Sequence, residues 1–254
     1  MLDNHDELTR ARHAYAYAPF RLARAAESYA HAVLWAQPVR VQGPVEKGAL
    51  GFAGHSAWDL DQYHHQLLRS ETDADVLLGV ASVTFWGFGQ GKDGRFTTAR
   101  ALARARIVAG LGKRGADDAP AIVGKVRAVC SLLDRGDRQG AVLEAMSLKH
   151  HGLAFATKLL AFSSPETECV YDEVISLRLQ SSSDIRLKDL HVSPVGKYRL
   201  AEKAAAYEGW AQLCTAKALE LNHDRGRWTD WDGAERPWRA VDVERAFFGL
   251  GRGA

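Results

Sequence analysis

The chain has 254 residues, of which 46% are hydrophobic and 25% are charged, and its formal net charge is +2. That composition is typical of an ordinary globular protein, and the length is enough for one large domain or two small ones. No long uncharged apolar run is present, which argues against a membrane-spanning protein.

The first segment, MLDNHDELTRARHAYAYAPF, lacks the apolar centre of a secretory signal, so a cytoplasmic protein is the default expectation. Its first dozen residues are expected to be mobile. Residues 18–36 place apolar side chains at three- and four-residue spacing, which predicts a helix. Residues 37–56 carry Pro38, Pro44 and several glycines, which predicts a small irregular or β element.

The remainder of the chain is helical in its periodicity. Asp73, Asp117 and Asp137 are start signals, because an aspartate side chain can accept hydrogen bonds from the first N–H groups of a helix. Glycine and aspartate cluster at 87–94 and 112–118, which predicts loops. The predicted helices, in chain order, span 57–69, 74–86, 95–110, 118–134, 138–146, 154–163, 172–180, 194–221 and 239–248.

Helices this short need tertiary neighbours to bury their apolar faces, which predicts one compact body over 1–254. The expected fold class is therefore all-α, with the small element near 37–56 as the exception. Two lobes are expected within the body. One lobe spans 70–180, and the other combines 15–69 with 190–250.

The cysteines are Cys130, Cys169 and Cys214. They are odd in number and far apart, which argues against a disulfide framework. They also cannot supply the four thiolates of an iron–sulfur cluster. Buried free thiols are therefore expected.

A short turn, LKHHG, joins two predicted helices within about 147–158. Gly152 in this turn suits either a positive φ or the close approach of another backbone. The N–H groups at the start of the following helix, together with the helix dipole, favour a phosphate. Such a helix–turn–helix can hold a DNA backbone without reading its bases.

The next segment, PETECVYDEVIS, places Asp172 after an apolar Val–Tyr pair. This aspartate can cap the following helix. A partly buried carboxylate can also stabilise positive charge on a sugar and orient or deprotonate a water, as in glycosidases. Capping and catalysis are compatible. Glu173 is the adjacent competitor, but its side chain leaves the helix about 100° away.

Taken together, LKHHGLAFATKLLAF and PETECVYDEVIS resemble the helix-hairpin-helix DNA glycosylases, and in particular the 8-oxoguanine DNA glycosylase-like bacterial subgroup that includes anti-phage defence enzymes. The resemblance covers about 85–180, with a weaker match at 236–250. It implies that Gly152 is the second hairpin glycine and that Asp172 is the catalytic aspartate. It also implies double-stranded DNA containing a modified base as the partner, a monomer, and no cofactor beyond a monovalent cation at the hairpin.

Two departures from that family pattern bear on the chemistry. His150 stands where the first hairpin glycine usually sits, and Ala154 stands where bifunctional members carry a Schiff-base lysine. The resemblance therefore implies a monofunctional enzyme that hydrolyses the glycosidic bond. Lys158 lies one turn later on the same helix face as Ala154. It is interpreted first as a base-pocket or phosphate contact, and otherwise as a displaced nucleophile or a plain surface lysine.

The resemblance assigns further roles. In loop 85–95, Gln90 would fill the gap left by an extruded base, with Phe88 as an alternative apolar wedge, and the competing interpretation is a flexible glycine-rich turn. The residues implied to bind DNA are Lys149, His150, His151, Gly152, Ala154, Gln90, Lys92 and Arg95. Those implied to line the base pocket are Lys158, Phe88, Trp238, Asp242 and Arg245.

Other side chains give weaker signals. The bases between Lys92 and Arg138 face few acids in the sequence, so this stretch either meets phosphates or forms a solvated helical surface. The segment HSAWDLDQYHH matches no metal signature, so no metal site is predicted and its histidines are expected to be exposed or in the core. Of Trp228, Trp231 and Trp238, most are expected in the core, and one could stack on an extruded base.

The leading hypothesis is a glycosylase that flips out glucosylated hydroxymethylcytosine in phage DNA and leaves an abasic site, as antiviral defence. The first alternative substrate is 8-oxoguanine, in a repair enzyme. The second alternative is a catalytically silent sensor of modified DNA, and the third is an all-α scaffold without affinity for DNA.

Overall fold

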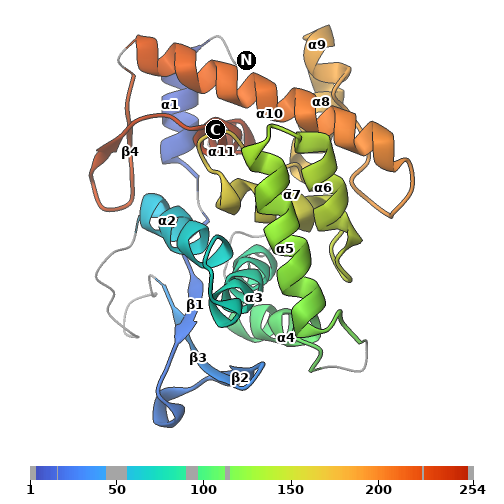
Figure 1. Cartoon of the computed structure of the whole chain (residues 1–254). Helices are drawn as coiled ribbons and strands as arrows, with labels where there is room; N and C mark the ends of the chain where they lie inside the picture. The colour runs from blue at the N-terminus through green and yellow to red at the C-terminus, as the bar shows by residue number, and fades with distance from the viewer. Residues whose placement is uncertain are drawn as a thin grey trace. The chain divides into compact units, whose positions relative to one another are not determined.

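The computed structural model describes residues 4–15, 17–43, 56–89, 97–111, 115–224 and 226–250. The chain is mostly helical and divides into two compact units (Figure 1). The first unit comprises Met1–Ala16, Ala128–Ser147 and His151–Ala254, and the second comprises Tyr17–Arg127 and Leu148–His150. The predicted lobe 70–180 is thus divided between the two units.

The second unit is built around one apolar helix. Helix α3 (Asp73–Gly89) has twelve buried residues and packs against α2 (Ala57–Leu68), α4 (Thr98–Val108) and strand β1 (Arg21–Arg24). A helix that is apolar on all sides must be surrounded by other elements, because no polar face remains for water. Helix α5 (Ala119–Asp134) begins in this unit and continues into the first.

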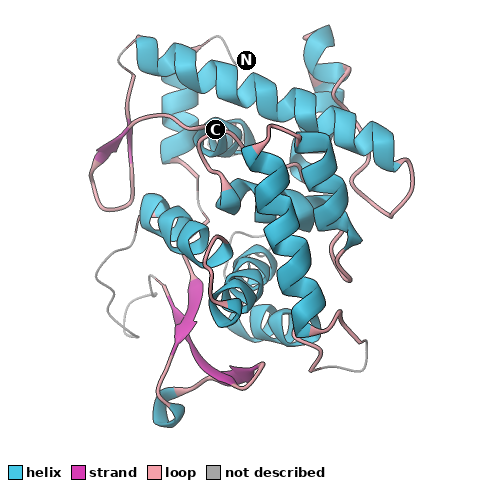
Figure 2. Ribbon diagram, in the orientation of Figure 1, coloured by secondary structure: helices cyan, strands magenta, loops and turns pink. Residues whose placement is uncertain are grey.

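A three-stranded antiparallel sheet replaces the helix predicted at 18–36, so that prediction is wrong (Figure 2). Strand β3 (Gln37–Gln42) lies between β1 (Arg21–Arg24) and β2 (Ala32–Leu34), and a 3₁₀ turn, η1 (Glu27–Tyr29), connects β1 to β2. The β element predicted near 37–56 is confirmed for β3, whereas residues 44–55 lie outside the described residues.

The sheet forms because its inward side chains complete the core of the second unit. Leu22, Leu34, Val39 and Val41 are buried in one cluster with side chains of α3 and α4. Strand β2 turns into β3 through Trp35 and Ala36, which both have positive φ. Two such residues match the twist of a two-residue hairpin turn.

The first unit is built around α11 (Ala240–Gly249), of which every residue is buried. Helices α1 (His5–His13) and α10 (Leu200–His223) pack against it, and α8 (Glu173–Ser181) also contacts it. The remaining elements are α6 (Arg138–Ser147), α7 (Leu153–Ser163), α8 (Glu173–Ser181), α9 (Ile185–Lys188), β4 (Trp228–Thr229) and β5 (Glu235–Arg236).

The expectation of a mobile N-terminal segment is wrong for the residues that the structure describes. Asn4 accepts a hydrogen bond from the Glu7 N–H and starts α1, whose Leu8 is fully buried. The helix lies so close to α11 that a Cβ on Gly249 would stand 2.4 Å from the Ala11 carbonyl oxygen. Glycine is therefore required at that crossing.

The helices predicted from 57–69 to 239–248 all occur in the structure, with shifted ends. The broad expectation of a mainly helical protein with a small β element is confirmed, and the short β4–β5 pair is an addition to it. The three cysteines are buried free thiols, as predicted. Among the described helices, none combines the length and apolarity needed to cross a membrane.

Candidate active site

Asp172 starts α8, and its two carboxylate oxygens have different surroundings. Oδ1 accepts hydrogen bonds from the N–H groups of Val174 and Ile175 at 3.0 and 3.1 Å. Oδ2 lies 3.8 Å from Nζ of Lys158. The side chain is 21% exposed, so it is held in place by the helix while remaining accessible. Glu173, by contrast, is exposed.

The segment before Asp172 is fixed by the elements around it. The hydroxyl of Thr157 lies 3.0 Å from the Tyr171 N–H and 3.3 Å from the Tyr171 carbonyl oxygen. The indole of Trp210 donates to the Val170 carbonyl at 3.0 Å, and the Tyr171 hydroxyl accepts from the Val192 N–H at 2.8 Å. Helices α7 and α10 therefore set the position of the carboxylate with little freedom.

Lys158 is only 8% exposed, so the interpretation as a plain surface lysine is wrong. Its ammonium lies between the Asp172 carboxylate and the Ala154 carbonyl oxygen, at 3.8 and 3.4 Å, and 5.3 Å from the centre of the Phe155 ring. The shared helix face predicted for residues 154 and 158 is confirmed. The structure thus brings the two candidate catalytic side chains together.

Glu244 on α11 is a further acidic group near this pair. It is 3% exposed, and its carboxyl group accepts a hydrogen bond from the Val170 N–H. Burial and then the charge of Asp172 raise its pKa to about 8, against the opposing effects of Arg245 and Lys158. Glu244 was not among the predicted site residues, although its neighbours at i±3 and i±4 are apolar and place it on a buried face: Val241, Ala240, Phe247 and Phe248.

The burial of Glu244 predicts a pH effect on stability. Its pKa rises on folding from an ordinary value near 4.5 to about 8, so the folded state binds the proton more tightly. The contribution of this group to the free energy of unfolding is fully present below pH 4.5 and is lost as the pH rises to about 8. Glu244→Gln should remove that decline while keeping an acceptor for Val170.

Chemical denaturation at several pH values between 4.5 and 8 checks this. The difference between variant and wild type should grow steadily across the range. Glu235→Gln, at an exposed position, controls for the loss of one negative charge. A constant difference between Glu244→Gln and wild type would contradict the expected burial.

In the second unit, the hairpin residues Lys149 and His150 are held by the segment before α5. Asp117 accepts a hydrogen bond from the Lys149 N–H at 2.8 Å, and the His150 ring lies 2.9 Å from the Gly115 carbonyl oxygen. His150 has a positive φ of 63°. The glycine that the family pattern usually carries at this position would adopt that conformation more easily. Asp117 therefore does not cap α5, and the cap is Asp118, which accepts from the Ala121 N–H.

In the first unit, Gly152 is the N-cap of α7, and no side chain caps the helix there. Its φ of −89° excludes the positive φ considered from the sequence. A Cβ added to Gly152 would meet no protein atom within 4 Å, so the fold itself does not require glycine. Of the two interpretations of Gly152, the one that stays a prediction is that glycine allows another backbone to approach closely. His151 is buried and its ring packs edge-on against Phe155.

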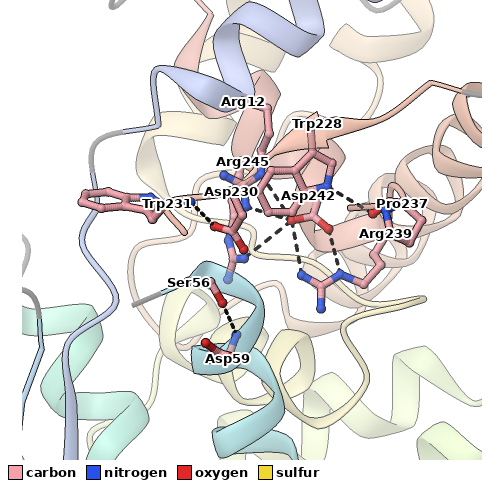
Figure 3. A network of polar contacts seen from close by, with 10 residues as sticks. All are labelled: Arg12, Ser56, Asp59, Trp228, Asp230, Trp231, Pro237, Arg239, Asp242 and Arg245. Atoms are coloured by element: carbon pink, nitrogen blue, oxygen red, sulfur yellow. Dashed lines mark hydrogen bonds and ion pairs between the residues drawn. The ribbon is translucent and has the colours of Figure 1, made fainter. Parts of the chain in front are cut away.

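Asp242, implied to line a base pocket, is the centre of a buried ion cluster (Figure 3). Its carboxylate lies 3.0 Å from Arg12, 2.7 Å from Arg239 and 3.7 Å from Arg245. The guanidinium of Arg12 also lies 3.6 Å from the centre of the Trp228 ring. Burial alone would raise the Asp242 pKa, but the three arginines outweigh it and lower the pKa below its ordinary value.

The other residues implied by the resemblance have varied positions. Trp238 is buried, and its backbone N–H and carbonyl both bond the side chain of Asn222. Phe88, in the second unit, is half-buried beneath the guanidinium of Arg104. The loop residues Gln90, Lys92 and Arg95 lie outside the described residues. The roles in DNA binding remain predictions.

Several basic side chains between Lys92 and Arg138 form ion pairs with acidic side chains that are not their neighbours in the sequence. Lys125 contacts Asp117, Arg127 contacts Asp73 and Arg138 contacts Glu168. Arg100 and Arg106 of α4 are exposed. The stretch is therefore a mixed surface. Within the described ranges, no group of three or more acidic, histidine or cysteine side chains could hold a metal ion.

Comparisons with protein-family models, with curated proteins and with solved structures found no match for this chain.

Proposed function

We propose that the chain is a monofunctional DNA glycosylase that removes a modified base from double-stranded DNA and leaves an abasic site. The proposed substrate is glucosylated hydroxymethylcytosine in phage DNA, removed as antiviral defence. The observation that carries the proposal is the accessible Asp172 carboxylate, with one oxygen fixed by α8 and the other directed toward Lys158.

The proposed chemistry depends on the different partners of the two Asp172 carboxylate oxygens. When the N-glycosidic bond breaks, the base leaves with the bonding electrons, and positive charge develops on C1′ of the sugar. Asp172 stabilises that charge and accepts a proton from the water whose oxygen bonds to C1′. Lys158 lies close enough to contact the departing base or a neighbouring phosphate.

Hydrolysis is proposed rather than lysine-dependent strand cleavage, because residue 154 is alanine and the Lys158 ammonium is paired with Asp172. Borohydride reduction during turnover separates the two, since only an imine between enzyme and sugar becomes covalent. We expect no trapped complex. A trapped complex that disappears with Lys158→Met would establish the displaced nucleophile instead.

Base release is the direct test of the proposed function. The purified chain is incubated with duplexes that contain glucosylated hydroxymethylcytosine, hydroxymethylcytosine or 8-oxoguanine, and freed bases are identified by mass. We expect the glucosylated base and a matching number of abasic sites. Release of 8-oxoguanine alone would support the repair enzyme, and binding to modified DNA without release would support the sensor.

Gly152→Ala tests the proposed contact of α7 with a DNA phosphate. The backbone conformation is open to alanine, so the free energy of unfolding should fall by about 1 kcal/mol or less. The added methyl group projects where the phosphate would approach the uncapped N–H groups. We expect duplex DNA to bind about tenfold more weakly, which corresponds to about 1.4 kcal/mol.

Fluorescence anisotropy at several salt concentrations measures this affinity. Gly124→Ala is the matched control, because Gly124 is exposed within α5 and its added Cβ also meets no atom within 4 Å. That variant should bind DNA like the wild type. Unchanged binding by Gly152→Ala would rule out a backbone contact at this glycine.

A further inference from the structure

Helix α11 holds the segment that leads to Asp172 at two places. The N–H groups of the first two residues of α11 donate to the carbonyl oxygens of Glu166 and Pro165 at 3.2 and 3.3 Å, respectively. One turn further along the helix, the carboxyl group of Glu244 accepts a hydrogen bond from the Val170 N–H. Glu244 is thus the contact of α11 that lies two residues before Asp172.

Glu244 and Asp172 are two carboxyl groups of one site with unequal surroundings. Asp172 is 21% exposed, accepts two backbone N–H bonds at the start of α8 and lies 3.8 Å from the Lys158 ammonium. Glu244 is 3% exposed, and its carboxyl group accepts from the Val170 N–H. Hydrogen bonds and an opposite charge favour the charged form of a carboxyl group, whereas burial favours the neutral form. The surroundings therefore place the proton on Glu244 and the negative charge on Asp172.

The ionisable side chains that act on Glu244 come from α7, α10 and α11, from the start of α8 and from the segment before it. They are Lys158, Cys214, Arg245, Asp172 and Cys169. The two thiols are fully buried, which raises their pKa and keeps them uncharged. The charges that these five groups provide are one carboxylate and two cations.

Both of these cations have acidic partners of their own. The Lys158 ammonium lies beside Asp172, and the Arg245 guanidinium lies 3.7 Å from Asp242. An ionised Glu244 would therefore bring a second buried negative charge to the site without a second cation to match it. It would also compete with Asp172 for Lys158, because both carboxylates act on the same ammonium.

We propose that Glu244 is a positioning residue for Asp172, which in its protonated form anchors the segment before α8 and leaves Asp172 the charged partner of Lys158. This inference rests on the proposed function only for the reaction that Asp172 carries out. When Glu244 ionises, the added charge draws Lys158 away from Asp172 and loosens the anchored segment. Base release should then slow.

A titration of Glu244 tests the arrangement without any excision. The full chain is labelled with ¹³C at the glutamate carboxyl groups, and NMR spectra follow the signal that is missing from Glu244→Gln. We expect this signal to titrate at about pH 8. Asp172→Asn should move the titration to lower pH by about one unit, because a like charge is removed, and Lys158→Met should move it to higher pH. Asp184→Asn, at the start of α9 in the same unit, should not move it.

Base release under single-turnover conditions tests the consequence for the reaction. Glutamine is neutral at every pH and keeps an acceptor for Val170, whereas leucine fills the space without one. At about pH 7, Glu244→Leu should release the base about tenfold or more slowly than Glu244→Gln, because the segment before Asp172 loses its anchor. The wild-type rate should fall severalfold between about pH 7 and about pH 9, and the rate of Glu244→Gln should not.

The outcomes separate this inference from the proposed function. A Glu244 signal that titrates near its ordinary pKa of 4.5, or that Asp172→Asn leaves unmoved, would overturn the role of Glu244 whatever the activity. Equal rates in the leucine and glutamine variants, or an alkaline fall that persists in Glu244→Gln, would also overturn it. The expected titration without base release from any duplex would support the charge arrangement and overturn the glycosylase.

Discussion

Replacing Asp172 with asparagine is expected to lower the rate of base release by at least about 100-fold, the usual contribution of a positioned acid–base group. Asparagine keeps the shape of the side chain and can still accept the two hydrogen bonds from Val174 and Ile175. It removes the negative charge that would stabilise the sugar cation and accept the proton of water. Single-turnover kinetics on the glucosylated duplex measures the effect.

The structure offers a matched control for that substitution. Asp184 is the N-cap of α9 in the same unit, and its side chain accepts the Arg186 N–H as Asp172 does for α8. Asp184→Asn should change neither thermal stability nor base release to a measurable degree. Asp172→Asn should remain folded and keep its helix cap, with a melting temperature lowered only by the loss of the Lys158 ion pair, while losing activity. Full activity in Asp172→Asn would remove the carboxylate from the mechanism.

The helical skeleton was predictable because apolar side chains recur at helical spacing along most of it, although α4, α10 and α11 have no capping side chain at their starts. The sheet of the second unit was not. Residues 18–36 contain alanines and leucines at helical spacing, and their hairpin turn is Trp35–Ala36 rather than the glycine or asparagine that usually marks positive φ. The burial of Leu22 and Leu34 against α3 decides the outcome, and such tertiary contacts have no local signature.

The candidate site likewise combines residues that could be predicted from the sequence with residues that could not. Asp172 was found because it follows the hairpin motif at the expected distance, and Lys158 was found because it shares a helix face with Ala154. The surroundings that hold them come from distant parts of the chain, such as Trp210 on α10 and Glu244 on α11. Arg12 was missed because it lies in a segment with ordinary surface composition, where its burial depends on packing against α11.

Replacing Asp242 with asparagine is expected to lower the free energy of unfolding by about 3–5 kcal/mol, the cost of breaking a buried ion pair from one side. Arg12, Arg239 and Arg245 would then share a buried site without the carboxylate that separates them. Because folding lowers the Asp242 pKa, its contribution is present above the ordinary value of 3.8 and is lost as the pH falls below it. The deficit of the variant should therefore be full at neutral pH and shrink in acid.

Urea denaturation at pH 7 and in acid measures both the size and the direction of this effect. Asp73→Asn is the matched control, since Asp73 pairs with Arg127 where both side chains are exposed at 65% and 48%. Exposed pairs contribute about 0–1 kcal/mol, so that variant should stay close to the wild type. Arg12→Met combined with Asp242→Asn should recover part of the loss, because fewer like charges remain buried. A loss no larger than that of the control would mean that water reaches the cluster and that the three arginines are not buried around Asp242.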